Sequence, residues 1–400
     1  MIQRHISAKL EALAAQFPVI LLTGPRQAGK TTLAKHLFPR HSYVSLEDPD
    51  NRESALADPR SFLERFKKGA IFDEVQRVHS LLSYLQTEVD RDASPGRFIL
   101  TGSHHLNLMD SVNQTLAGRV AVTHLLPLSL AELQGQPASE PFRVLSKCES
   151  RADTPSLQLY QALFTGGYPR IHDRGLNPRD WMASYYQTYV ERDVRDIINI
   201  GDLDTFQRFV RLCAGRSGQL LNLTSLGVDA GITHTTARKW LSALQAGFLV
   251  HLLPPHHANF SKRLVKTPKL FFLDTGLLCY LLGIRDADTI ATHPLRGAIF
   301  ETLIVTELIK AFTHAGEVPP LYFWRDRTGH EVDVVVDAGT ELIPVEIKSG
   351  ATVIPSFFDG LRFFCKLGAP ASTRGVLVHG GSTPAYMREG FCVKPWFALV

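Results

Sequence analysis

The sequence predicts an α/β protein of two to three domains, and three observations support this prediction. The chain has 400 residues, which is more than a single hydrophobic core usually organises. In its first third, short apolar runs alternate with helical patterns, as they do in a parallel sheet covered by helices. Hydrophobic residues make up 44% and charged residues 20% of the chain, which excludes collagen-like, coiled-coil and wholly disordered proteins.

The net charge does not identify a binding partner, whereas the cysteine pattern bears on the cellular compartment. A net charge of +4 does not by itself imply nucleic acid. No two of the five cysteines form a CxxC pair, so we expect neither a zinc knuckle nor a disulfide framework; they are Cys148, Cys213, Cys279, Cys365 and Cys392. No signal-peptide pattern and no run of about 18 uncharged apolar residues occurs, so we expect a cytoplasmic protein without a membrane span.

A phosphate-binding loop is predicted after the first apolar run, residues 18–23. The octet GPRQAGKT at 24–31 fits the pattern GxxxxGKS/T, with a strand before it and a helical pattern after it. The glycines let successive N–H groups face phosphates, and the helix N-terminus favours anions. Lys30 can reach the β- and γ-phosphates, and the Thr31 hydroxyl can bind Mg²⁺. We therefore predict an ATP and Mg²⁺ site formed by Gly24, Pro25, Arg26, Gln27, Ala28, Gly29, Lys30, Thr31 and Thr32.

Two further strand-like segments end in residues that suit ATP hydrolysis. The segment AIFDE at 70–74 places Asp73 to hold Mg²⁺ through water and Glu74 to polarise the attacking water. The segment RFILTGS at 97–103 ends in small polar residues. Either Ser103 or Thr101 could hydrogen-bond the attacking water as a sensor of the γ-phosphate, although a turn-capping serine fits the pattern equally well.

An arginine before the next strand suggests an ATP site shared between subunits. Arg119 follows Leu116-Ala117-Gly118 and precedes the strand pattern of 120–126. From this position it could stabilise the charge that develops on the γ-phosphate of a neighbouring subunit. The alternative is an exposed arginine at the start of a strand. We expect a homo-oligomer if the first interpretation holds.

The middle of the chain is predicted to be helical. Residues 131–158 are rich in proline and polar residues, which favours a linker or insertion. Residues 219–250 have the pattern of a helix-turn-helix, in which Gly231 ends the first helix and Thr233 caps the second. The segments 248–253 and 270–273 could be the two strands of a wing.

The region around this helix-turn-helix is strongly basic. Between residues 205 and 275, only Asp229 and Asp274 oppose nine basic residues, which are Arg208, Arg211, Arg216, Arg238, Lys239, Lys262, Arg263, Lys266 and Lys269. A basic helix-turn-helix with a basic wing favours phosphate contacts with DNA through Arg238, Lys239, Lys262, Arg263 and Lys266. The alternative is a winged-helix module that packs against protein.

The last third carries carboxylates and a lysine in a spacing that suits metal chemistry. Glu346 and Lys348 are two apart in a predicted strand, so they lie on the same face. Asp333 on the neighbouring strand and Glu301 on the preceding helix can join them. Two carboxylates that hold Mg²⁺ beside a lysine can activate water for phosphodiester cleavage. A structural ion pair without activity is an equally good interpretation.

Taken together, these segments resemble a prokaryotic family of AAA+-type ATPases with a C-terminal domain of unassigned function. The resemblance covers nearly the whole chain, and its signatures occur in order. They are GPRQAGKTTL (24–33), FDEVQ (72–76), LTGSHHL (100–106), LAGRV (116–120), PLSLAEL (127–133), GGYPR (166–170), YVERDV (189–194), LVKTPKLFFLDTGL (264–277), GAIFETLIVTEL (297–308), HEVDVVV (330–336) and IPVEIKSG (343–350).

The resemblance implies four domains. They are an AAA+ ATPase core at 1–135, a helical lid-like segment at 155–216, a winged-helix segment at 217–280 and a PD-(D/E)xK nuclease-like domain, of the restriction-endonuclease class, at 281–400. It also implies that Lys30 and Thr31 bind nucleotide and Mg²⁺, that Asp73 and Glu74 serve hydrolysis, and that Arg119 acts on a neighbouring subunit. Glu301, Asp333, Glu346 and Lys348 fall on the nuclease-like motif.

Three functions are therefore expected from the sequence, in order of preference. The first is an ATP-hydrolysing protein that binds duplex or branched DNA and whose ATP state controls subunit arrangement. The second is an ATP-regulated, Mg²⁺-dependent DNA endonuclease. The third is a signalling ATPase switch that acts on a protein partner.

Overall fold

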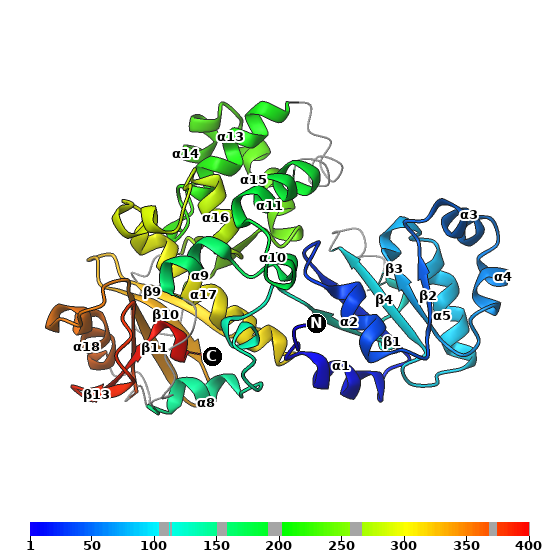
Figure 1. The fold of residues 1–400 in the computed structure, drawn as a ribbon, viewed down its shortest axis with the longest axis horizontal. Coiled ribbons are helices and arrows are strands. Elements are labelled where there is room, and N and C mark those ends of the chain that lie inside the picture. Colours follow the sequence, from blue (N-terminus) through cyan, green and yellow to red (C-terminus); the bar gives the residue numbers. More distant parts are fainter. Residues whose placement is uncertain are drawn as a thin grey trace. The chain divides into compact units, whose positions relative to one another are not determined.

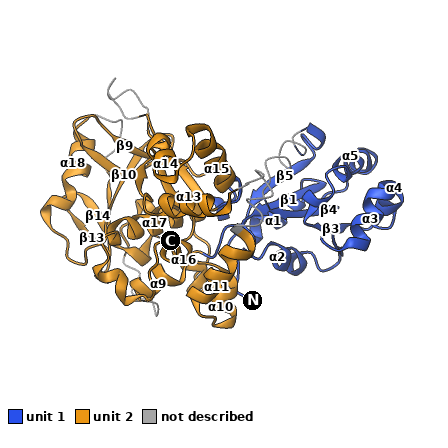
Figure 2. Cartoon of the chain, turned by 90° about the horizontal axis from the view of Figure 1, so that it is seen from above, with its two compact units in different colours: residues 1–128, 246–248, 313–317 blue, residues 129–245, 249–312, 318–400 orange. Residues whose placement is uncertain are grey.

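The computed structural model describes residues 1–103, 112, 114–149, 158–190, 202–256, 266–367 and 374–399, in two compact units (Figure 2). Unit 1 comprises residues 1–128, 246–248 and 313–317, and unit 2 comprises the rest. No helix within the described ranges has both the length and the hydropathy needed to cross a membrane.

Unit 1 contains a five-stranded parallel sheet with the strand order β2-β3-β4-β1-β5 (Figure 1). The strands are β1 (Val19–Gly24), β2 (Ser42–Ser45), β3 (Ala70–Asp73), β4 (Phe98–Ser103) and β5 (Val120–His124). All four neighbouring pairs are parallel. The carboxyl ends of the strands therefore meet at one edge of the sheet, which brings Gly24, Asp73 and Ser103 to the same side and confirms the predicted strands.

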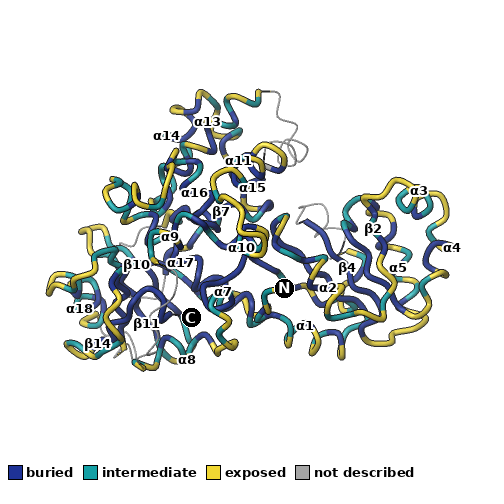
Figure 3. The backbone as a smooth tube through the Cα atoms, viewed as in Figure 1, coloured by how far each residue is buried: buried dark blue, intermediate teal, exposed yellow. Residues whose placement is uncertain are grey.

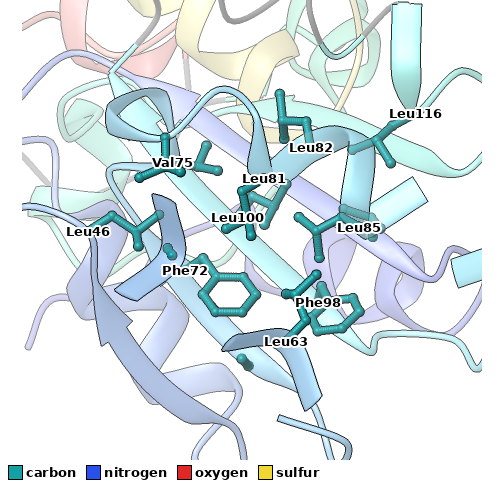
Figure 4. Close-up of a cluster of buried hydrophobic side chains, with 14 of the residues drawn as sticks. Leu46, Leu63, Phe72, Val75, Leu81, Leu82, Leu85, Phe98, Leu100 and Leu116 are labelled. Atoms are coloured by element: carbon teal, nitrogen blue, oxygen red, sulfur yellow. The ribbon is translucent and has the colours of Figure 1, made fainter. Parts of the chain in front are cut away.

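Helices cover the sheet of unit 1, and each of its faces has its own core. The helices are α1 (Ser7–Ala14), α2 (Lys30–Leu37), α3 (Pro49–Ala57), α4 (Pro59–Glu64) and α5 (Leu81–Arg91). Side chains alternate along a strand, so Leu21 joins the cluster of Phe72 and Leu85, whereas Ile20 joins the opposite cluster. Figure 4 shows the first cluster, where Phe72 and Phe98 pack between Leu63 and Leu100. Strands β1, β3 and β4 are buried along their length, whereas the two edge strands, β2 and β5, include exposed residues (Figure 3).

Unit 2 begins with short helices where the sequence predicted a linker or insertion over 131–158. Helices α7 (Leu130–Leu133) and α8 (Pro141–Ser146) lie in the described part of that range. Ser129 and Glu132 form a capping box around the start of α7, and both are buried. The buried carboxylate of Glu307 accepts a hydrogen bond from the N–H of Leu130 at 2.7 Å. This segment is therefore packed, because local caps and a distant carboxylate satisfy its polar backbone groups.

The expectation that the cysteines form no disulfide framework is wrong for two of them. Cys148 and Cys392 form a disulfide, with their Cα atoms 5.5 Å apart at a sequence separation of 244. The bond connects the residues after α8 to strand β14 (Phe391–Pro395). Cys213, Cys279 and Cys365 form no disulfide among the described residues. No local cysteine motif reports a pairing at this separation, so the sequence could not reveal it.

The helix-turn-helix predicted at 219–250 is present with small shifts in its bounds. The elements run in the order α13 (Leu203–Ala214), β6 (Gln219–Leu220), α14 (Leu223–Ala230), α15 (His234–Ala246), β7 (Val250–Leu253) and β8 (Lys269–Phe272). Gly231, at φ +77°, ends α14, and the Thr233 hydroxyl accepts a hydrogen bond from the Thr236 N–H at 3.1 Å. The strands form an antiparallel sheet in the order β6-β8-β7, in which β6 was not predicted.

Further helices flank this module in unit 2. They are α9 (Leu159–Thr165), α10 (Pro169–Arg174), α11 (Pro178–Tyr185), its π-helical continuation Tyr186–Val190, and α16 (Thr275–Leu281). The Asp274 carboxylate caps α16 and also accepts the N–H of Gly167 at 2.7 Å. A Cβ atom on Gly166 would lie 2.4 Å from this carboxylate. The GGYP turn, which follows α9, is therefore held against the start of α16 by the Asp274 carboxylate.

The last part of unit 2 is a helix followed by a mixed six-stranded sheet. Helix α17 (Arg296–His314) precedes β9 (Leu321–Arg325), β10 (Glu331–Asp337) and β11 (Leu342–Lys348), which pair antiparallel. Helix α18 (Asp359–Lys366) leads to β12 (Val376–His379), β13 (Tyr386–Arg388) and β14. Strands β11, β12 and β14 are parallel neighbours. The predicted helix with Glu301 and the two predicted strands with Asp333 and Glu346 are confirmed, while the nuclease-like assignment stays a prediction.

Candidate functional site

The predicted phosphate-binding loop connects β1 to α2 in a conformation that depends on glycine. Gly24 has φ +144°, and a Cβ atom there would lie 2.1 Å from the carbonyl oxygen of Leu125. Gly29 caps α2 at φ +94°. The buried guanidinium of Arg4 donates to the carbonyl oxygens of Ala28 at 2.8 Å and Leu126 at 2.6 Å, which fixes the loop against the segment that follows β5. The sequence offered no signal for the role of Arg4.

Lys30 lies at the centre of this loop and is 6% exposed. Its ammonium group donates to the carbonyl oxygens of Gly24 at 3.0 Å and Pro25 at 2.8 Å. Burial lowers the pKa of Lys30 to about 8, although the negative charges of Glu74 and Asp73 oppose the shift. The lysine thus lies at the first turn of α2, where a P-loop holds phosphates.

The carboxylate of Asp73 is the meeting point of three hydroxyl groups. The Thr31 hydroxyl lies 2.9 and 3.0 Å from its two oxygens, and the Tyr43 hydroxyl donates to it at 2.9 Å. The Thr101 hydroxyl donates to the same carboxylate. A carboxylate next to a threonine hydroxyl is the donor set that a P-loop uses for Mg²⁺, so the residues present fit the predicted ion.

Thr101 and Ser103 have different roles in this arrangement. Because Thr101 donates to Asp73, its hydroxyl is already engaged. The Ser103 hydroxyl is buried and has no hydrogen-bond partner among the described groups. Ser103 and Thr101 were the two candidates for a sensor of the γ-phosphate. Ser103 is therefore the candidate whose hydroxyl is available to form a further hydrogen bond. Its contact with the attacking water remains a prediction.

Glu74 follows Asp73 in an uncommon backbone conformation. Its φ of 57° and ψ of 47° lie in the left-handed region. The side-chain amide of Gln76 donates to its carboxylate. Tyr43 and Gln76 are both residues that the sequence analysis missed. Gln76 lies within the FDEVQ segment, whereas Tyr43 is 30 residues away from the aspartate that it contacts.

Arg119 lies at the opposite edge of the sheet from the phosphate-binding loop. Its carbonyl oxygen accepts the N–H of Val19, the first residue of β1, whereas the loop follows the other end of that strand. Six residues of strand span about 20 Å. The Arg119 guanidinium forms a two-point ion pair with Asp90, at 2.5 and 3.1 Å. Arg119 therefore cannot reach the loop of its own chain, and any role in hydrolysis requires a second copy.

The basic residues of segment 205–275 divide into two groups. Arg238 and Lys239 on α15 and Lys266 before β8 are exposed, whereas Lys262 and Arg263 lie outside the described residues. Arg216 instead forms an ion pair with Asp229. Lys269 is buried between two glutamates, so counting it among the basic residues that surround the helix-turn-helix was misleading.

The four residues of the predicted nuclease-like motif lie close together in unit 2. Lys348 contacts Glu346 at 2.5 Å, and Asp333 accepts the N–H of Ile347 at 2.7 Å. Glu301 accepts from Lys269 at 3.0 Å. Burial raises the pKa of Glu301 and of Glu346, and the negative charge of Asp333 raises both further.

A divalent cation does not fit this second cluster. Within the described ranges, no three side chains capable of binding metal are arranged to hold an ion. Lysine ammonium groups already occupy oxygens of Glu301 and Glu346. Thr31 and Asp73 of unit 1 thus fit Mg²⁺, whereas the carboxylates of the unit 2 cluster do not.

Comparison with known proteins places the first site in a recognised domain. Residues 16–134 match the family described as AAA domain, and residues 156–288 and 296–399 match two domains of unknown function, DUF8612 and DUF4143. Uncharacterized protein Mb2031c of Mycobacterium bovis and Uncharacterized protein Rv2008c of Mycobacterium tuberculosis are each 32% identical over 364 residues, covering 90% of this chain and 76% of theirs. The chain belongs to the family of these two proteins. Its AAA domain contains the phosphate-binding loop and Asp73.

Solved structures resemble the chain only distantly. The Walker-type ATPase PABY2304 of Pyrococcus abyssi has a TM-score of 0.43 at 15% identity, covering 70% of this chain and 96% of its own. RuvB of Thermotoga maritima has a TM-score of 0.31 at 18% identity, covering 62% and 87%. DnaA of Aquifex aeolicus has a TM-score of 0.30 at 13% identity, covering 60% and 85%. Likenesses at these scores carry no argument about function.

These findings confirm the coarser part of the expectations. The chain is a P-loop ATPase of the AAA type. The match to the AAA domain and the geometry around Lys30 and Asp73 both support this assignment. The winged-helix and nuclease-like assignments remain predictions, because the matching domain families have no known function.

The lowered pKa of Lys30 predicts that ATP binding takes up a proton in mild alkali. Lys30 in the free protein loses its proton above about pH 8, and the phosphates of ATP favour its charged form. ATP affinity should therefore fall as the pH rises above about 8, by up to about tenfold for each pH unit. Calorimetry in buffers of different ionisation enthalpy should show proton uptake near pH 9 and little near pH 7.

Lys30→Arg is the matched control, because its guanidinium stays protonated throughout this range. This variant should bind ATP without proton uptake. The same pH dependence in the wild type and in Lys30→Arg would contradict the assignment of the shift to Lys30.

Proposed function

We propose that this chain is an AAA-type ATPase that binds DNA, and that its ATP state controls the arrangement of its subunits. The observation that carries DNA binding is the exposed face of α15. Arg238 and Lys239 are exposed there, and the helix contains no acidic residue. His234, Thr235 and Ser242 add hydrogen-bonding side chains to the same helix.

The order of elements supports this use of α15. A helix, a strand, two helices and two strands follow one another in the order of a winged helix, with α15 as the second helix of the helix-turn-helix. In this motif the second helix enters the major groove of DNA. Lys266 lies just before β8, next to the predicted wing. Basic side chains in both positions suit phosphate contacts.

The core of the module is complete without the basic face. Trp240 packs edge-on against Phe206 and Phe209 of α13, at ring distances of 5.3 and 5.5 Å. Leu241 and Leu244 are buried on the same helix. Because the apolar side of α15 is already covered, the basic side is available to a partner, and its charge favours a polyanion over a protein surface.

ATP hydrolysis is assigned to the residues at the carboxyl edge of the unit 1 sheet. Bound Mg²⁺ would neutralise charge on the phosphates, with Thr31 and Asp73 as the residues that hold it. Lys30 contacts the β- and γ-phosphates. Glu74 polarises the attacking water, and the Ser103 hydroxyl orients it. A second copy supplies Arg119, which makes hydrolysis dependent on subunit contact.

DNA binding through α15 predicts a salt-dependent affinity that two substitutions weaken. Arg238→Ala and Lys239→Ala should each lower the affinity for duplex DNA by about tenfold. Each should also reduce the salt slope of log K by about one, because each removes one phosphate contact. Fluorescence anisotropy at several salt concentrations measures both quantities.

Arg285→Ala removes an exposed arginine outside this module and should change neither quantity. An affinity for DNA that does not depend on salt or on α15 would contradict the proposal. Nucleotide-dependent assembly without DNA affinity would instead favour a switch that acts on a protein partner.

The shared ATP site predicts complementation between two inactive variants. Arg119→Ala should lower kcat by about 10³-fold, since it removes charge stabilisation at the γ-phosphate. Lys30→Ala should be inactive because it loses phosphate contact. In a mixture of the two, a Lys30→Ala subunit can supply Arg119 to an intact site, so part of the steady-state turnover should return.

Asp90→Asn is the control, because it releases Arg119 from its ion pair but keeps the guanidinium. This variant should retain turnover. If Arg119→Ala hydrolyses ATP at the wild-type rate, or if the mixture stays inactive, the shared site is wrong.

A further inference from the structure

Lys269 is a buried lysine at the point where three elements of unit 2 converge. It begins β8, and its side chain is 4% exposed. Its ammonium group lies 3.0 Å from the carboxylate of Glu301 on α17 and 2.5 Å from that of Glu331 on β10. The ring of Phe323 lies 5.6 Å from it. Both partners of this lysine are acidic, and one of them belongs to the predicted metal-binding motif.

The charges of this cluster leave little need for a divalent ion. Its four carboxylates are Glu301, Glu331, Asp333 and Glu346, and its three cations are Lys269, Arg325 and Lys348. With every group ionised, four negative and three positive charges leave a net charge of −1. A divalent ion would change this to +1 in a largely buried site, which costs free energy.

The carboxylate oxygens also have separate partners. Asp333 accepts the backbone N–H of Ile347, and Glu346 accepts from Lys348 with one oxygen. The other oxygen of Glu346 is buried without a hydrogen-bond partner and faces Gly360, where a Cβ atom would lie 2.8 Å away. Divalent cations need several oxygens around one centre, and in the described part of the chain no such group exists.

We infer that the ammonium group of Lys269 takes the place of a divalent cation among Glu301, Glu331 and Asp333, so that this cluster is a metal-free ion-pair site. A lysine from β8 then neutralises the carboxylates that α17 and β10 present. The cluster connects the β6-β8-β7 sheet to helix α17 and strand β10. The nuclease-like motif is present in this chain, but its metal-binding function is replaced by an internal cation.

Mn²⁺ binding to the full chain without nucleotide tests this inference. Asp73→Asn serves as the background, because it removes the other metal site. In that background, electron paramagnetic resonance should detect no Mn²⁺ binding that depends on Asp333. Adding Asp333→Asn should therefore leave the amount of bound Mn²⁺ unchanged at Mn²⁺ concentrations up to millimolar. Mn²⁺ binding that disappears with Asp333→Asn while Lys269 is in place would overturn the inference.

Lys269→Met gives the complementary result, since it removes the ammonium group but keeps an unbranched side chain. In the same background it should gain Mn²⁺ binding that depends on Asp333, and Mn²⁺ should raise its thermal unfolding midpoint. Lys266→Met, three residues earlier and exposed, is the matched control and should gain neither. A folded Lys269→Met that binds no Mn²⁺ would also overturn the inference. If this variant does not fold, the measurement with Lys269 in place still decides.

Discussion

The hydrogen-bonded carboxylate of Asp73 is the interaction on which the ATP site depends. A buried carboxylate is stable only when donors satisfy it, and here hydroxyl groups from α2, β2 and β4 do so. These three contacts fix the start of α2 and the ends of two strands relative to one another. The same contacts place Thr31 beside Asp73 as a pair that suits Mg²⁺ and bring Ser103 to the same edge of the sheet.

The sequence predicted the parts of this site that depend on local chemistry. The octet 24–31 and the acids at 73 and 74 were found because a tight glycine turn, a helix start and a strand end leave a readable pattern. Tyr43 and Gln76 were missed. Tyr43 meets Asp73 only because β2 and β3 are neighbours in the sheet. The disulfide between Cys148 and Cys392 was missed for the same reason, because sequence spacing does not report distant pairing.

Residue type alone also did not reveal which charges face solvent. Lys266 and Lys269 are three residues apart and were counted together as basic residues of one surface. The first is exposed, whereas the second is buried against Glu301 and Glu331. The exposed basic residues of α15, Arg238 and Lys239, are therefore the main candidates for DNA contact. The difference between the two lysines also turns a predicted metal site into a cluster in which a lysine is the cation, since burial of one ammonium group satisfies two carboxylates.

We propose that ATP hydrolysis by unit 1 is coupled to DNA binding by unit 2. Steady-state ATP hydrolysis, measured without DNA and with linear duplex, single-stranded DNA and a four-way junction, tests it most directly. We expect at least one form to stimulate hydrolysis in the wild type, and the stimulation to weaken in Arg238→Ala. Equal hydrolysis rates with every DNA and without DNA would contradict the claim.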